Sequence, residues 1–105
     1  MQPGELADKL AAGHPAAVID VRTGFEFRSG HIPGAINAPI WKIMLGMAAL
    51  PADKQAGMVV LCELGPRAVM ARTLLGLIGY RNTLLLAGHM AAWRRFGLPL
   101  ERTEK

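Results

Sequence analysis

The sequence predicts an α/β fold with a central, mostly parallel sheet flanked by helices on both faces. Short runs of β-branched and aliphatic residues alternate with longer segments in which apolar residues recur at helical spacing. Glycine or proline separates most of these segments, and no repeat or low-complexity linker interrupts them. Alternation of this kind favours a parallel sheet, because each helix returns the chain to the edge at which the next strand starts.

The chain is expected to open with a short helix and a buried strand. Residues 5–12 carry Leu6 and Leu10 on one helical face, and Gly13 supplies a stop. Residues 17–21 (AVIDV) form an apolar, β-branched run that is too short for a helix. We therefore expect the first strand of the sheet here.

An acidic residue, Asp20, lies inside this predicted strand. A buried carboxylate needs a partner, because burial of an unpaired charge is costly. We expect Asp20 to accept hydrogen bonds from a neighbouring loop or to pair with Arg22. Either arrangement gives Asp20 a structural role, which we favour over a catalytic one.

The next segment combines a capped helical turn with an irregular bend. Thr23 and Glu26 have the spacing of a capping box, so a helical turn should follow and end near Gly30. In the GHIPG bend that comes next, we expect His31 to hold the backbone together. Residues 35–38 then predict a short strand at or near an edge of the sheet.

The remaining chain is predicted to contain three helices and two strands. We expect helices over residues 41–50, 67–78 and 89–96, and strands over residues 58–61 and 83–86. The side chains expected on the buried faces of the first two helices are Trp41, Met44 or Leu45, Ala48, Val69, Thr73, Leu74, Leu77 and Ile78.

Two further assignments concern side chains of these helices. Met44 and Met47 are assigned to core or groove packing rather than to a cofactor contact. In the last helix, Trp93 is expected to face inward, and Arg94 and Arg95 are expected to face outward.

The sequence CELGPR, residues 62–67, joins the strand over 58–61 to the following helix and contains the chain's only cysteine. Backbone N–H groups of a tight loop and of a helix N-terminus converge on one point and favour an anion there. With the sulfur of Cys62 at that point, its thiolate is stabilised and becomes a nucleophile. Arg67 is expected to add a full positive charge at the mouth. These residues predict an anion-binding catalytic loop centred on Cys62.

Composition limits the class of protein. With 105 residues, of which 51% are hydrophobic, we expect one domain over residues 1–105 with a single core. One cysteine permits no internal disulfide, which favours a reducing compartment. We recognise no leader and no apolar run of membrane length, so we expect a cytoplasmic protein without membrane contact.

The net charge is +4, and the excess of arginine lies in the second half of the chain. Because no basic run is interleaved with aromatic residues, we do not expect nucleic acid as a partner. A small anionic substrate drawn toward Arg67 is favoured instead.

The cysteine and the three histidines are scattered and lack the spacing of metal ligands. We therefore expect no metal and no organic cofactor. His14 is expected to be an exposed turn residue.

Four segments of the chain form a specific combination when taken in this order. They are VIDVR (residues 18–22), FEFRSGHIPGAINAP (25–39), VVLCELGPRA (59–68) and LAGHMAAW (86–93). With a GHIPGA segment followed by a six-residue Cys-to-Arg loop, the chain resembles a single-domain rhodanese, the sulfurtransferase homology domain, over nearly its whole length. The resemblance implies a rhodanese-like three-layer sandwich with Cys62 as the sulfur acceptor.

The resemblance also implies a reaction. A sulfane sulfur would pass from thiosulfate or another persulfide donor, through a Cys62 persulfide, to cyanide, glutathione or a protein thiol. Because the sequence has no second cysteine to resolve the persulfide, we expect an external acceptor. The residues implied to bind the substrate are Glu63, Leu64, Gly65, Pro66, Arg67 and His89, and those implied to support the site are Asp20, Arg22 and His31.

Four residues depart from the common pattern of this family, and one of them, Ala68, stands where a hydroxyl residue is common. Glu63 would repel an anionic donor if it pointed inward, and an orientation toward solvent fits the sequence equally well. Pro66 lacks an N–H, so the loop has one donor fewer, although its fixed φ suits the start of a helix. His89 replaces the second glycine of a common pair. We favour a surface or capping role for His89, with a role as acid, base or substrate contact as the alternative.

Other functions remain as alternatives to sulfur transfer from small donors. The main one is a sulfur-relay carrier that a partner protein loads and that shows little activity on thiosulfate, which the apolar Leu64 at the rim would suit. A non-catalytic interaction domain is disfavoured because Cys62 and Arg67 are both present. Phosphatase chemistry is disfavoured because phosphatases of this fold carry five residues between cysteine and arginine, whereas four stand here.

Overall fold

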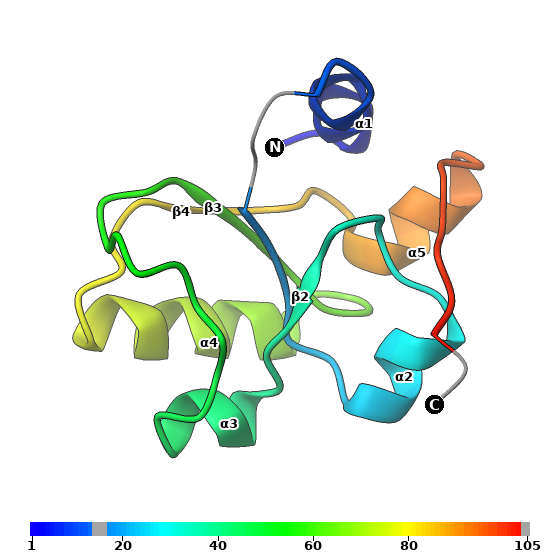
Figure 1. Ribbon diagram of the computed structural model, residues 1–105. Coiled ribbons are helices and arrows are strands. Elements are labelled where there is room, and N and C mark those ends of the chain that lie inside the picture. The colour runs from blue at the N-terminus through cyan, green and yellow to red at the C-terminus, as the bar shows by residue number, and fades with distance from the viewer. Residues whose placement is uncertain (14–16, 104–105) are drawn as a thin grey trace.

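A four-stranded parallel sheet forms the centre of the protein (Figure 1). The computed structural model describes residues 1–13 and 17–103, so the prediction for His14 falls outside the described residues. The strands are β1 (Ala17–Asp20), β2 (Ile36–Asn37), β3 (Met58–Leu61) and β4 (Thr83–Leu85), in the order β2-β1-β3-β4. The expected parallel sheet is confirmed, and the short strand β2 lies at its edge, as predicted.

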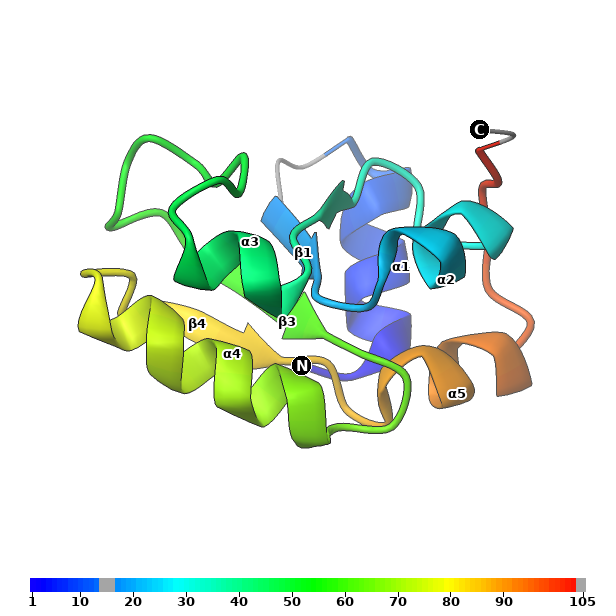
Figure 2. The same cartoon turned by 90° about the horizontal axis from the view of Figure 1, so that it is seen from below.

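Helices cover both faces of the sheet and complete a three-layer arrangement (Figures 1 and 2). The helices of the described residues are α1 (Pro3–Ala11), α2 (Gly24–Ser29), α3 (Ile40–Met44), α4 (Pro66–Leu77) and α5 (His89–Arg95). One apolar cluster joins the sheet to α3 and α4, and a second cluster joins it to α1 and α5. The predicted sandwich of layers is therefore confirmed.

Strand β3 shows why the sheet needs both layers. Met58 and Val60 belong to the cluster under α3 and α4, whereas Val59 and Leu61 belong to the cluster under α1 and α5. All four residues are buried, because successive side chains of a strand point to opposite faces and both faces are covered. Cys62 continues this alternation and lies in the cluster on the α3 and α4 side.

The buried face of α4 differs from the prediction. Ala68, Ala71 and Leu75 are fully buried against the sheet. Of the residues predicted to face inward, those that are exposed are Val69, Thr73, Leu77 and Ile78, whereas Leu74 packs against the core as expected. The buried set has the same helical spacing, but two of its members are alanines, whose small side chains give a weak hydrophobic signal and let the helix approach the sheet closely.

Helix α3 is shorter than predicted and buries less. It ends at Met44, and Gly46, with φ +70°, takes the left-handed conformation that terminates a helix. Ile43 is buried, whereas Trp41 and Met44 are 54% and 67% exposed. Met47 is also exposed, so the assignment of these methionines to core packing is wrong.

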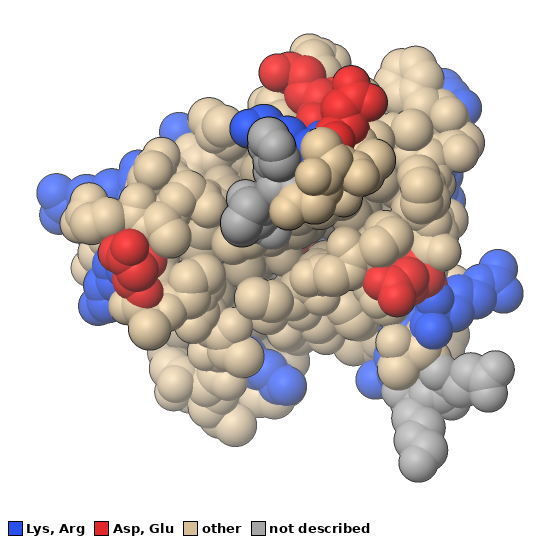
Figure 3. Space-filling model, turned by 45° about the horizontal axis from the view of Figure 1, so that its top comes forward, with Lys and Arg blue, Asp and Glu red and all other residues tan. Residues whose placement is uncertain are grey.

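The other elements lie within about two residues of their expected positions. Trp93 is buried, and Arg94 and Arg95 are exposed, as expected. On the face shown in Figure 3, basic and acidic side chains form small separate groups with uncharged residues between them, so the net charge is not gathered there. None of the helices in the described ranges is long and apolar enough to cross a membrane.

The revised face of α4 can be tested with two leucines of the same helix. Leu75→Ala removes a fully buried side chain, so we expect the free energy of unfolding to fall by about 2–5 kcal/mol. Leu77→Ala removes a side chain that is 78% exposed and should change it by no more than about 0.5 kcal/mol. Urea unfolding of both variants checks this. Equal losses would mean that α4 is rotated relative to the structure.

Candidate active site

The Cys62 loop lies at the carboxyl end of β3, where the chain turns into α4. Cys62 is almost completely buried. The N–H of Gly65 donates to the Sγ of Cys62 at 3.0 Å, so one backbone dipole points at the sulfur. Gly65 has φ +139°, a conformation that favours glycine, and Pro66 begins the helix directly after it. The Gly-Pro pair of the sequence thus shapes the turn that faces the sulfur.

The start of α5 holds the loop from the other side. The N–H of Met90 donates to the carbonyl of Cys62 at 3.0 Å, and the N–H of Ala91 donates to the carbonyl of Glu63 at 3.2 Å. The N–H of Cys62 in turn donates to Nδ1 of His89 at 3.3 Å. Three hydrogen bonds therefore fix the backbone of the loop to α5.

His89 is buried beside Cys62, so the surface role that the sequence favoured is wrong. Its ring accepts the N–H of the cysteine, and desolvation by burial lowers the pKa of His89 below its ordinary value. Its backbone has φ +53°, the left-handed region that a residue with a side chain rarely adopts. Sequence reasoning identified this position as unusual, because histidine stands where the family commonly has glycine.

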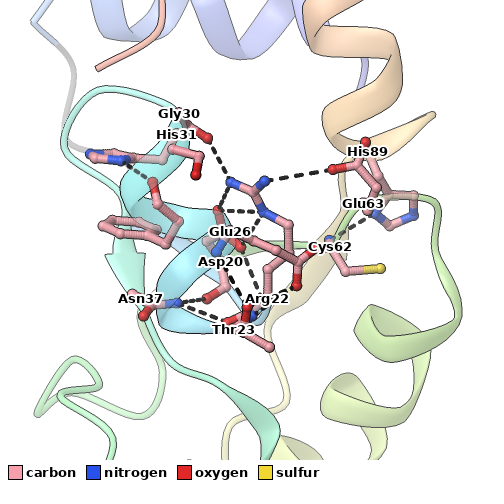
Figure 4. A network of polar contacts seen from close by, with 12 residues as sticks. Asp20, Arg22, Thr23, Glu26, Gly30, His31, Asn37, Cys62, Glu63 and His89 are labelled. Carbon is pink, nitrogen blue, oxygen red and sulfur yellow. Dashed lines mark hydrogen bonds and ion pairs between the residues drawn. The ribbon is translucent and has the colours of Figure 1, made fainter. Parts of the chain in front are cut away.

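A buried ion pair lies behind the loop (Figure 4). Arg22 Nη2 lies 2.8 Å from Asp20 Oδ2, and both side chains are at most 3% exposed. The same Nη2 donates to the carbonyl of Gly30 at 2.8 Å. The predicted pairing of Asp20 with Arg22 is confirmed, and the pair joins β1 to the bend that contains His31.

Glu63 points to two arginines rather than at the sulfur or into open solvent. Its Oε1 lies 3.6 Å from Nη1 of Arg22, and its Oε2 pairs with Nη2 of Arg94 on α5. Figure 4 shows the carboxylate turned toward Arg22, with the sulfur of Cys62 pointing away from it. The negative charge of Glu63 is therefore balanced. Arg94 is a site residue that sequence reasoning missed, because nothing in the local pattern relates it to Glu63.

Arg67 does not stand as a free charge at the mouth. Its guanidinium binds Glu26 through two hydrogen bonds, of 2.7 Å and 3.1 Å. Glu26 also caps α2 by accepting the N–H of Thr23 at 3.1 Å. The sequence identified the capping box but gave no sign of this second role. Arg67 therefore ties the start of α4 to the start of α2.

This pair shifts both of its pKa values. The hydrogen bond from Arg67, aided by those from Thr23, lowers the pKa of Glu26 to about 2, against the opposing effect of partial burial. The hydrogen bond from Glu26 raises the pKa of Arg67 above its ordinary value. The pair is therefore ionised on both sides over the whole neutral range.

His31 and Leu64 take different places around the site. Nδ1 of His31 lies 2.7 Å from the carbonyl of Phe27, and the two rings stack with centroids 3.8 Å apart. His31 also exchanges two backbone hydrogen bonds with Glu101, so it holds the bend, as expected.

Leu64 is 74% exposed and forms an apolar part of the rim. In the part of the chain that the structure describes, no three metal-binding side chains lie together.

Removal of the Glu26 carboxylate should destabilise the protein in a pH-dependent way. Because the folded pKa of about 2 lies below the ordinary 4.5, the ionised carboxylate stabilises the fold above about pH 4.5, and this contribution is lost as the pH falls toward 2. We expect Glu26→Gln to be less stable than the wild type at pH 7 and the difference to shrink below pH 4.5. Urea unfolding between pH 7 and 3 measures it.

A matched control for this test is Glu5→Gln. Glu5 accepts the N–H of Gln2 at 3.0 Å and so caps α1 as Glu26 caps α2, but its side chain has no arginine partner among the described residues. At pH 7 the Glu26 variant should lose more stability than the Glu5 variant. Equal losses would show that the pair with Arg67 contributes nothing beyond the cap.

Known proteins are similar to this chain in sequence. The family model of the rhodanese-like domain matches residues 2–96. A sulfurtransferase of Allochromatium vinosum is 34% identical over 99 residues, which cover 94% of this chain and 91% of that protein. The human thiosulfate:glutathione sulfurtransferase is 32% identical over 101 residues, covering 85% of this chain and 87% of that protein.

A solved structure extends the similarity to the fold. The crystal structure of the Alr3790 protein from Anabaena sp. superimposes with a TM-score of 0.89 at 28% identity, covering 99% of this chain and 83% of that one. The family match spans the sheet, the cysteine loop and the start of α5. The chain therefore belongs to the rhodanese-like domain family.

Proposed function

We propose that the protein is a sulfurtransferase that moves a sulfane sulfur from thiosulfate or a persulfide to a thiol through a Cys62 persulfide. The observation that carries this proposal is the N–H of Gly65, which points at the buried Sγ of Cys62 at the carboxyl end of β3. Relatives that are sulfurtransferases support the general reaction class. A lone free thiol suits a reducing compartment such as the cytoplasm.

The reaction proceeds in two displacements. The thiolate of Cys62 attacks the outer sulfur of thiosulfate, the sulfur–sulfur bond breaks, and sulfite leaves with the electron pair. The thiolate of an acceptor then attacks the terminal sulfur of the persulfide, and Cys62 leaves as the thiolate. Because the sequence contains one cysteine, the acceptor is another molecule, such as glutathione or a protein thiol.

The neighbouring residues position the sulfur rather than react. Gly65 donates to the sulfur, and Pro66 starts α4 close behind it. Arg67 holds the loop against α2 through Glu26. The support residues Asp20, Arg22 and His31 fix the end of β1 and the bend that follows it.

A sulfur-relay carrier is the second candidate, and a specific observation favours it. The positive charge of Arg67, which was expected to attract thiosulfate, is bound to Glu26. The rim carries exposed apolar side chains, with Leu64 74% exposed, and Phe25 on the neighbouring α2 is 75% exposed. Such a rim suits contact with a protein donor better than capture of a small dianion.

Sulfur loading of the purified protein distinguishes these functions. Intact-mass spectrometry after thiosulfate should show one added sulfur on the wild type and none on Cys62→Ser, which keeps the shape of the site without the thiol. Cyanide or glutathione should then remove that sulfur. Loading from a protein persulfide but from neither thiosulfate nor glutathione persulfide would favour the relay carrier, and no loading from any donor would refute sulfur transfer.

The balance of charge at Glu63 gives a second test. Arg94→Ala leaves the Glu63 carboxylate with less compensation beside the loop, so we expect the rate of loading from thiosulfate to fall by about two- to five-fold at low salt. Arg95→Ala makes the same change of net charge on the same helix, but Arg95 lies over the Phe96 ring and does not pair with Glu63. It should therefore leave the rate near that of the wild type. Equal effects would mean that only the net charge matters.

A further inference from the structure

We propose that His89 is a substrate contact, whose neutral ring donates an Nε2–H hydrogen bond to the anionic sulfur species held at Cys62. This inference rests on the proposed sulfur transfer and assigns one more donor to its anion cradle. In this role the ring binds the sulfur-donating substrate and then the Cys62 persulfide, and it moves no proton.

The hydrogen bond from the backbone fixes the tautomer of the ring. The N–H of Cys62 lies 3.3 Å from Nδ1 of His89, and a backbone amide can only donate. Nδ1 is therefore the acceptor and carries no hydrogen. A neutral imidazole with a bare Nδ1 carries its hydrogen on Nε2, which makes Nε2 a donor.

The same contact excludes acid–base roles for the ring. Protonation would put a hydrogen on Nδ1, directly against the N–H of Cys62, so that two donors would face each other. Burial of the ring also disfavours its protonated form, since it lowers the pKa of His89. Of the three roles that a histidine can play near a thiolate, only that of a hydrogen-bond donor fits this geometry.

Nε2 lies on the side of the ring that faces Gly65, the residue whose N–H points at the sulfur. A Cβ added to Gly65 would lie 3.3 Å from Nε2 of His89, and Gly65 is the residue whose N–H lies 3.0 Å from Sγ of Cys62. Figure 4 shows the ring next to Cys62. The imidazole and the amide of Gly65 therefore lie on neighbouring parts of one cradle.

Nε2 is open to a ligand. It makes no hydrogen bond to any of the described residues, although His89 is only 7% exposed. No fully buried side-chain nitrogen or oxygen of the described residues lacks a partner, so Nε2 keeps some contact with solvent. An anion that enters the cradle can reach this hydrogen and satisfy it.

Two features of the chain explain why a side chain supplies this donor. Pro66 has no N–H, so the loop presents one amide fewer to an anion than a loop without proline would. His89 has φ +53°, a backbone conformation that glycine adopts without strain. A histidine held in that conformation, with its ring against Gly65 and the N–H of Cys62, supplies a donor in place of the missing amide.

NMR of the nitrogen-labelled histidines in the wild-type protein tests the assignment directly. At neutral pH, His89 should be neutral, with its hydrogen on Nε2, and the Nε2 signal should shift when Cys62 is loaded with sulfur and return when glutathione removes it. A hydrogen on Nδ1, or an Nε2 signal that loading does not change, would overturn the inference.

Two variants separate the contact from a structural role. His89→Asn keeps an oxygen that can accept the N–H of Cys62 but lacks a donor at the position of Nε2, so kcat/KM for loading from thiosulfate should fall about ten-fold. His89→Gln extends an amide N–H toward that position and should recover part of the loss. A folded Asn variant that loads at the wild-type rate would refute the His89 contact but would leave the proposed sulfur transfer standing. Failure of the wild type to load from any donor would refute both the proposed function and the His89 contact.

Discussion

The site depends on one constraint, which is that the backbone of a buried loop must find hydrogen-bond partners. Cys62 and Glu63 lie where β3 has ended and α4 has not begun, so their carbonyl groups have no ladder or helix to join. The first turn of α5 supplies the missing donors through Met90 and Ala91, and the ring of His89 supplies the acceptor for the N–H of Cys62. The buried sulfur is therefore held by a contact between two segments that only the sheet order β3-β4 brings together.

The charged side chains around the loop are also paired, each with an opposite charge. Arg22 and Arg94 balance Glu63, and Glu26 balances Arg67. In the proposed function, the attraction for an anion at Cys62 therefore comes from the N–H of Gly65, which points at the sulfur, rather than from an uncompensated cation. Oriented dipoles act over a short range, so in the proposed function the loop would discriminate by the shape and position of the anion more than by its total charge.

The sequence predicts those parts of this architecture that depend on local pattern. The four strands, the cysteine loop and the capping box of Thr23 and Glu26 all carry their signal within a few neighbouring residues. The face of α4 was mispredicted because the side chains that approach the sheet most closely are alanines, which a hydrophobic pattern hardly registers. The pairs of Arg67 with Glu26 and of Arg94 with Glu63 join residues 41 and 31 positions apart. Only the packing of the helices decides such pairs.

His89 departs from the rule that glycine occupies positions with a left-handed backbone. Gly88 before it must be glycine, because φ is +71° and a Cβ there would lie 2.4 Å from the Cβ of Ala92. The next residue is also left-handed but has room for a ring, which lies against Gly65 and Cys62. Gly65 in turn leaves that room, since a side chain on it would press against the imidazole. Gly65 thus leaves the space in which the imidazole accepts the N–H of Cys62, and this packing keeps His89 in its strained backbone conformation.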